Sequence, residues 1–165
     1  MQTSGDSKAL WMSVLAGAAG GLVGSFLTNR FQATLEAVTK PAGNESDNSD
    51  QDVTIKTAQL ISRKIFDHDL TQSEKKWAGP VVHYTFGTIL GAAYGALPLN
   101  AGAGTLYGTA VWLGADEVAV PSLRLSETPE KTPVVDHAKA LASHLVFGLA
   151  THFTRTAILK LAGRA

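Results

Sequence analysis

The sequence predicts an all-α fold: an integral membrane bundle of four glycine-rich transmembrane helices, with an extra amphipathic helix in the first long connection. Charged residues form only 17% of the 165-residue chain and gather in two connections and at the chain ends. Of the 16 glycines, 12 fall within the four long apolar stretches, and Gly102 lies at the edge of the third. In water a mid-helix glycine costs about 1 kcal/mol relative to alanine, so a soluble bundle would lose about 10 kcal/mol. In lipid, small residues instead allow helix backbones to pack closely.

We place the four spans at residues 9–28, 78–97, 103–120 and 137–161 of a single membrane domain, residues 1–165. Each has about the length that a hydrocarbon core of roughly 30 Å requires. The first span is longer than the apolar core of a secretion signal, and no small-x-small cleavage site follows it, so we expect it to be retained. The last span is the least apolar, because it contains His144, His152 and Arg155.

The first connection contains two different segments. Residues 41–52 form a polar insert, and its stretch from Asn44 to Asp52 has no apolar side chain, which predicts a flexible loop. Residues 53–66 place isoleucine and leucine opposite lysine and arginine at helical spacing. This pattern predicts an amphipathic helix near the membrane surface or against the bundle.

Local signals predict where several helices begin and end. Thr71 and Glu74 have the spacing of a capping box, so a helix should begin there. The short uncharged run at residues 98–102 predicts a tight antiparallel hairpin between the second and third spans. Asp136 is expected to cap the last helix.

Many of the glycines recur four residues apart and therefore share helix faces. We expect them to form helix-packing surfaces, within one chain or between copies. These residues are Gly17, Gly21, Gly24, Gly87, Gly91, Gly95, Gly104 and Gly108.

The composition argues against several classes of function. There is no cysteine, and 14 basic residues balance 14 acidic ones, so no basic field attracts a nucleic acid. No nucleophile elbow, phosphate loop or dinucleotide-binding motif is present. We therefore assign no catalytic residue and no metal ligand, leave the cofactor open, and expect a non-enzymatic protein.

Ionisable residues inside a membrane are costly and are candidates for function. The predicted intramembrane polar site consists of Arg30, His83, Asp116, Glu117, His144 and Arg155. Three roles remain open. The carboxylates can pair with Arg30 or a histidine and fix the helix register, or the site can conduct protons or ions, because histidine titrates near neutral pH. His83 and His144 can also ligate a haem or a metal from two helices.

The last helix carries a polar stripe. His137, His144, Thr151 and Arg155 lie within roughly 40° of one another on a helical wheel, whereas His152 lies off the stripe. We expect the stripe to face the bundle interior.

The chain resembles the YagU-like family of uncharacterised bacterial inner-membrane proteins. The resemblance lies in the run AKALASHLVFG from Ala138 to Gly148, in Arg155 after it, and in GPVVHY from Gly79 to Tyr84. It implies a multi-pass protein of the bacterial inner membrane with a link to acid tolerance. No catalytic residue is carried over from the resemblance, because none is established for the family.

The function that we expect is assembly in the lipid bilayer, as a homo-oligomer or as an accessory subunit of a membrane complex. The alternatives are a proton-linked or small-solute transporter or channel, and a haem- or metal-binding subunit. Basic residues crowd the first and third connections, which predicts that both connections are cytoplasmic and both termini outside.

Overall fold

A computed structural model of the chain describes residues 4–39, 49–97 and 103–163, and these residues form helices and their connections. The long helices are α1 (Ser4–Thr39), α2 (Ser49–Phe66), α3 (Gln72–Ala96) and α6 (Val134–Leu161). Between α3 and α6 lie α4 (Ala103–Trp112), a π-helical segment η1 (Leu113–Ala119), α5 (Val120–Ser122) and the 3₁₀ turn η2 (Pro129–Lys131). No β-strand occurs in these three described ranges, so the all-α prediction is confirmed.

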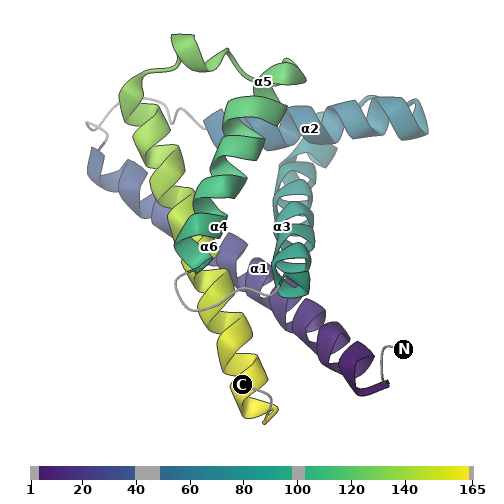
Figure 1. Cartoon of the computed structure of the whole chain (residues 1–165). Helices are drawn as coiled ribbons and strands as arrows, with labels where there is room; N and C mark the ends of the chain where they lie inside the picture. Colours follow the sequence, from purple (N-terminus) through teal and green to yellow (C-terminus); the bar gives the residue numbers. More distant parts are fainter. Residues whose placement is uncertain (1–3, 40–48, 98–102, 164–165) are drawn as a thin grey trace.

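Four helices form the bundle and are arranged in the order α3, α1, α6, α4. Helix α1 packs against both α3 and α6, and α6 packs against α4. Figure 1 shows α1 crossing α6, with α3 and α4 running antiparallel and α2 lying across the end of α3. The second and third spans run antiparallel, as the predicted hairpin requires, but α3 packs chiefly on α1 and α4 packs chiefly on α6. The turn of the hairpin, at residues 98–102, lies outside the described residues.

Two glycine faces of α1 create this order. A Cβ atom on Gly17 or Gly21 would collide with the backbone of Gly87, Gly91 or Gly95 on α3. On the neighbouring face, a Cβ atom on Gly20 would collide with the Thr151 carbonyl of α6, and one on Gly24 would press on the Phe147 ring and the Thr151 hydroxyl. The α1 backbone thus lies against two helices at once.

Helices α4 and α6 also cross through close backbone contacts at glycines. Gly104 lies against the Gly148 carbonyl, and Gly108 lies against the His144 carbonyl. Gly148 in turn faces the backbones of Gly104 and Gly108. Gly114 differs from all of these, since a Cβ atom there would meet nothing within 4 Å.

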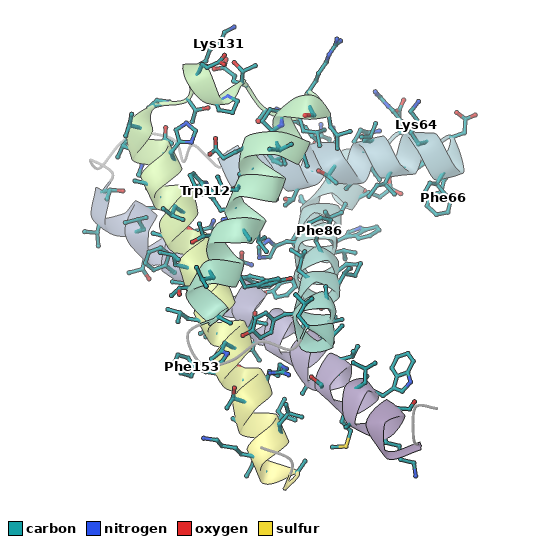
Figure 2. The ribbon with its side chains drawn as sticks, viewed as in Figure 1. Lys64, Phe66, Phe86, Trp112, Lys131 and Phe153 are labelled. Carbon is teal, nitrogen blue, oxygen red and sulfur yellow. The ribbon has the colours of Figure 1, made fainter. Side chains whose placement is uncertain are left out.

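Burial in the described helices is the reverse of that in a soluble bundle. The buried positions of α1, α3, α4 and α6 are mostly glycine, alanine, serine and threonine, with Tyr94 and Phe147 as the large exceptions. Large apolar side chains point outward, among them Trp11, Phe86, Leu106 and Phe153, and Figure 2 shows Phe86 and Phe153 directed away from the bundle. Of the described helices, one contains a segment, Ser7–Thr39, that is long and apolar enough by length and composition to cross a membrane.

The helix ends test the local predictions. The Thr71–Glu74 capping box is confirmed: the Thr71 side chain accepts from the Glu74 N–H, and the Glu74 side chain accepts from the Thr71 N–H. The Asp136 cap is wrong, because α6 begins at Val134 after Pro133 and Asp136 lies in its first turn. There its carboxylate is 3.3 Å from Lys139 Nζ.

The boundaries of the first connection also differ. Helix α2 begins at Ser49, so the last four residues of the predicted flexible insert form its first turn. The earlier part of that insert lies outside the described residues. Pro80 is accommodated inside α3, which continues on both sides of it.

Candidate functional site

The π-helical segment η1 brings two adjacent carboxylates to α6. Glu117 Oε1 lies 2.6 Å from Nδ1 of His137, in the first turn of α6. The other ring nitrogen, Nε2, lies 3.0 Å from the Pro129 carbonyl oxygen. A carbonyl oxygen only accepts, so Nε2 carries a proton, and the contact with Glu117 needs another. An imidazolium ring facing a carboxylate satisfies both contacts.

The surroundings of His137 favour its protonated form. The hydrogen bond to the Pro129 carbonyl, followed by the Glu117 carboxylate, raises the pKa of His137 above its usual value of 6.5. Both side chains are partly exposed beside the charged connection that precedes α6. The ring of Trp112 meets the His137 ring edge to face, with the centroids 6.4 Å apart.

A second carboxylate–histidine contact lies two turns further along α6. Asp116 Oδ2 is 3.5 Å from His144 Nδ1, which is ion-pair distance rather than a hydrogen bond. His144 Nδ1 is also 2.9 Å from the Ala140 carbonyl oxygen, so Nδ1 carries a proton and donates it to its own helix. Asp116 and Glu117 therefore each lie near a histidine. The structural role predicted from the sequence, in which the carboxylates pair with Arg30 or a histidine and fix the helix register, requires such pairs.

His83 makes a contact where α3 crosses α1. Its Nε2 lies 3.3 Å from the Ser25 carbonyl oxygen. The Ser25 hydroxyl is buried against Gly87, and no hydrogen-bond partner for it occurs among the described residues. His83 thus contacts the backbone of α1, and His144 lies beside Asp116 of η1.

The two arginines of the predicted site lie apart from the carboxylates. Arg30 is exposed on α1 and lies over the Phe26 ring, with its Cζ atom 5.1 Å from the ring centroid. Arg155 follows His144 by eleven residues on α6, a rise of about 16 Å, and contacts the opposite end of the bundle. Its side chain donates to the hydroxyl of Ser13 on α1. The six residues predicted as one polar site therefore divide among several contacts.

Sequence reasoning missed the polar junction around Arg155. Ser13 Oγ donates to the Gly95 carbonyl at 2.5 Å, and the Tyr94 hydroxyl lies 2.6 Å from His152 Nδ1. The Tyr107 hydroxyl donates to the Leu90 carbonyl at 2.6 Å. These contacts join α1, α3, α4 and α6. The available signal was that tyrosines inside apolar helices need hydrogen-bond partners for their hydroxyl groups.

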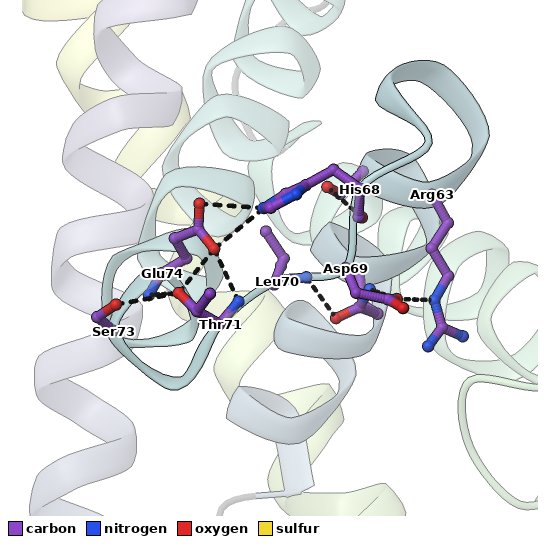
Figure 3. Close-up of polar contacts among 9 residues, drawn as sticks. Arg63, His68, Asp69, Leu70, Thr71, Ser73 and Glu74 are labelled. Atoms are coloured by element: carbon purple, nitrogen blue, oxygen red, sulfur yellow. Dashed lines mark hydrogen bonds and ion pairs between the residues drawn. The ribbon is translucent and has the colours of Figure 1, made fainter.

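A third polar group joins α2 to α3 outside the bundle (Figure 3). Glu74 accepts from Thr71, and its Oε2 lies 3.1 Å from His68 Nε2. The hydrogen bonds from Thr71, and then the one from His68, lower the pKa of Glu74 to about 2. Arg63 pairs with Asp69 on the other side of the loop.

Within the described part of the chain, no group of three histidine or carboxylate side chains lies close enough to hold a metal ion. No family model, no curated protein and no solved structure matches this chain. The resemblance to the YagU-like family is therefore without support from these comparisons.

Proposed function

We propose that the chain is an integral protein of the bacterial inner membrane that crosses it four times and acts by assembly, as a homo-oligomer or as an accessory subunit of a membrane complex. The proposed spans are the central part of α1, most of α3, the continuous helix α4–η1, and α6 after Lys139. The lipid bilayer and other membrane proteins, including further copies of the chain, are the proposed partners.

The reversed burial carries this proposal. Leu106 is 75% exposed and Phe153 is 64% exposed, whereas Thr151 on the same helix as Phe153 is 0% exposed. In water, exposed leucine and phenylalanine side chains lose the hydrophobic stabilisation that burial gives, about 1.5–3 kcal/mol each. In lipid these side chains are solvated, and the small residues supply close helix packing.

Helix length supports three further spans, in addition to the α1 segment that is long and apolar enough by its own composition. Helix α3 has 25 residues and α6 has 28, which correspond to roughly 37 and 42 Å at 1.5 Å per residue. Residues 103–122 are helical without interruption through α4, η1 and α5, about 30 Å. Each helix is therefore long enough to cross a hydrocarbon core of about 30 Å beside α1.

Assembly is supported by what the outward faces carry. Trp11, Phe86, Ile89, Leu106 and Phe153 are exposed apolar side chains on different helices. Such surfaces favour contact with lipid or with another apolar protein surface. The polar side chains of Ser13, Tyr94 and Tyr107, in contrast, make their hydrogen bonds within the bundle.

The test is co-purification and crosslinking of the full chain in native membranes. Alkaline extraction should leave the protein in the membrane pellet. Because the chain has no cysteine, single variants such as Leu106→Cys and Phe153→Cys report contacts between copies as disulfide dimers. Either specific dimers or a second polypeptide in fixed stoichiometry is expected. A chain that alkali extracts, or that stays monomeric with no partner, contradicts the proposal.

A second candidate function is proton-linked transport through His83, Asp116, Glu117 and His144. The pairing of Asp116 with His144 and of Glu117 with His137 favours it, because adjacent acid–base pairs can pass a proton between them. A π-helical segment such as η1 is also frequent at functional sites. Proton flux into proteoliposomes should fall in Asp116→Asn and His144→Ala. Equal flux in these variants and the unmodified chain would argue against transport.

A further inference from the structure

Arg155 occupies an unusual position for an arginine in this fold. It lies on the part of α6 that faces α1 and α3, five residues before Lys160, which is in the last turn. Five residues correspond to roughly 7 Å of helix, so the proposed membrane location places Arg155 just inside one bilayer surface. A guanidinium at that depth is costly unless an anion or water compensates its charge.

The described residues around Arg155 supply no such anion. The ion pairs of the described side chains involve Arg63, His68, His137, Lys139 and His144. What contacts Arg155 is neutral: the Ser13 hydroxyl, 2.8 Å from Nη2 and 3.1 Å from Nε, and the Tyr94 ring. The Arg155 Cζ atom lies 5.8 Å from the centroid of that ring.

These contacts fix the orientation of the guanidinium. The Ser13 hydroxyl is itself anchored, because it donates to the Gly95 carbonyl of α3. Tyr94 is fully buried, and its hydroxyl is bound to His152. Helices α1 and α3 therefore hold one edge and one face of the group, so little side-chain entropy remains to be lost when it binds a ligand.

The remaining edge has the geometry of an oxyanion site. A guanidinium has five N–H groups, and Ser13 accepts from one on Nε and one on Nη2. The Nη1–Nη2 edge has no acceptor among the described residues. Two parallel N–H groups on one edge match two oxygens of a phosphate in a bidentate pair.

We propose that Arg155 is a binding site for a phosphate oxyanion, held at the junction of α1, α3 and α6. The phosphate belongs either to a phospholipid headgroup or to a free phosphate ion. The site is separate from the carboxylate–histidine contacts of η1. The lipid source rests on the proposed membrane location, whereas binding of free phosphate does not.

The test uses the purified full chain in a neutral detergent, with phosphatidylglycerol and inorganic phosphate as separate probes and native mass spectrometry and thermal melting as readouts. Phosphatidylglycerol should bind and raise the melting temperature. Arg155→Lys keeps the charge but loses the fork and should bind about tenfold more weakly, the factor that loss of one charge-assisted hydrogen bond gives. Ser13→Ala should also weaken binding, and Arg155→Gln should abolish it.

Lys160→Gln is the matched control, because it removes an equal charge from an exposed position on the same helix. It should leave binding unchanged within about twofold, since general attraction of cations for anionic headgroups is weak per residue. Binding of inorganic phosphate that depends on Arg155 identifies a soluble ligand, and binding of phosphatidylglycerol alone identifies the lipid.

Failure to bind either probe, or equal losses in Arg155→Lys and Lys160→Gln, overturns the site. If Arg155→Gln does not fold, the Arg155→Lys and Ser13→Ala measurements decide. Alkaline extraction of membranes tests the membrane location separately, so the two failures are distinguishable.

Discussion

At the residue scale, the glycines of α1 limit which substitutions the α1–α3 interface can accommodate. Gly21 faces the Gly87 carbonyl so closely that any β-carbon requires the two helices to separate. Separation also weakens the neighbouring contacts of Gly17 with Gly91 and Gly95, because both lie on the same helix face. The cost of a single methyl group is therefore shared by the whole α1–α3 interface.

We predict that Gly21→Ala destabilises the protein by about 1–3 kcal/mol or more, the range for an extra methyl group forced into a packed interface. Gly114→Ala is the control, because a Cβ atom there meets nothing within 4 Å. Alanine is also the better helix former, so Gly114→Ala should be neutral or slightly stabilising. Unfolding of both variants in detergent micelles measures the difference, and similar stabilities would show that the α1–α3 contact is not as close as described.

Glu74 makes stability depend on pH at the start of α3. Its pKa is about 2 in the folded chain against 4.5 for an unperturbed carboxyl. A depressed pKa contributes stability that is complete above about pH 4.5 and is lost as the pH falls through about 2. Unfolding measured between these values should show a steeper loss for the unmodified chain than for Glu74→Gln. Parallel pH curves for the two proteins would contradict the prediction.

The glycine positions and this cap show what local sequence predicts well. The capping box depends on residues three apart, so its spacing alone identifies it. The spacing of the glycines does not show which helix packs on each face. Gly17 packs against α3 and Gly20 against α6, but the sequence shows only that the two glycines point in different directions. The pairing of Arg155 with Ser13 joins residues 142 positions apart, and no local pattern encodes it.

At the scale of elements, the position of α2 agrees with its amphipathic sequence. It lies across the end of α3, where Gly79 approaches the side chains of Thr54 and Ile55. Figure 2 shows Phe66 directed toward the side on which the bundle lies and Lys64 directed away from it. With the proposed spans in the bilayer, α2 lies parallel to the membrane surface with its apolar side facing lipid.

We predict that an environment-sensitive probe attached to Phe66→Cys reports a lipid-like surrounding, whereas the same probe on Lys64→Cys reports water. The cysteine-free chain makes both labels specific. A probe on Phe86→Cys, on the outer face of α3, controls for insertion of the bundle. Lipid contact at position 86 combined with water at position 66 would show that α2 stands clear of the membrane.

The positions of most helices can be predicted from the sequence, but the π-helical form of η1 and the start of α6 cannot. The apolar stretches predicted α1, α3, α4 and α6, since long apolar periodicity is the strongest local signal. The π-helical form of η1 was not foreseen, because its composition does not differ from that of an α-helix. The start of α6 was misplaced because Pro133 ends the preceding extended backbone and Asp136 follows it too late to act as a cap.

At the scale of the whole molecule, both described chain ends lie at one end of the bundle and α2, α5 and η2 lie at the other (Figure 1). The described basic residues of the two charged connections lie on or next to α2, the start of α3, α5 and η2, at this second end. Positive charge near membrane-spanning helices favours the cytoplasmic side. The proposed orientation therefore places α2 and η2 in the cytoplasm. It places the start of α1 and the end of α6, next to the two chain termini, outside.

We predict that a reporter active only in the cytoplasm is inactive when fused after α6. The same reporter inserted next to η2 should be active. An active fusion after α6 would reverse the orientation or require an odd number of spans. Expression levels of the two fusions, measured by immunoblot, control for unequal synthesis.

The central place of α1 has a consequence for how the chain is made. Its first glycine face is covered once α3 has been synthesised, but its second face waits for α6, as the contact between Thr151 and Gly20 spans 131 residues. At about 5–20 residues per second, that wait is on the order of ten seconds. With the proposed spans in the bilayer, α1 and α3 form a partial bundle during this wait, and the open glycine face of α1 is available to the insertion machinery and to quality-control proteases.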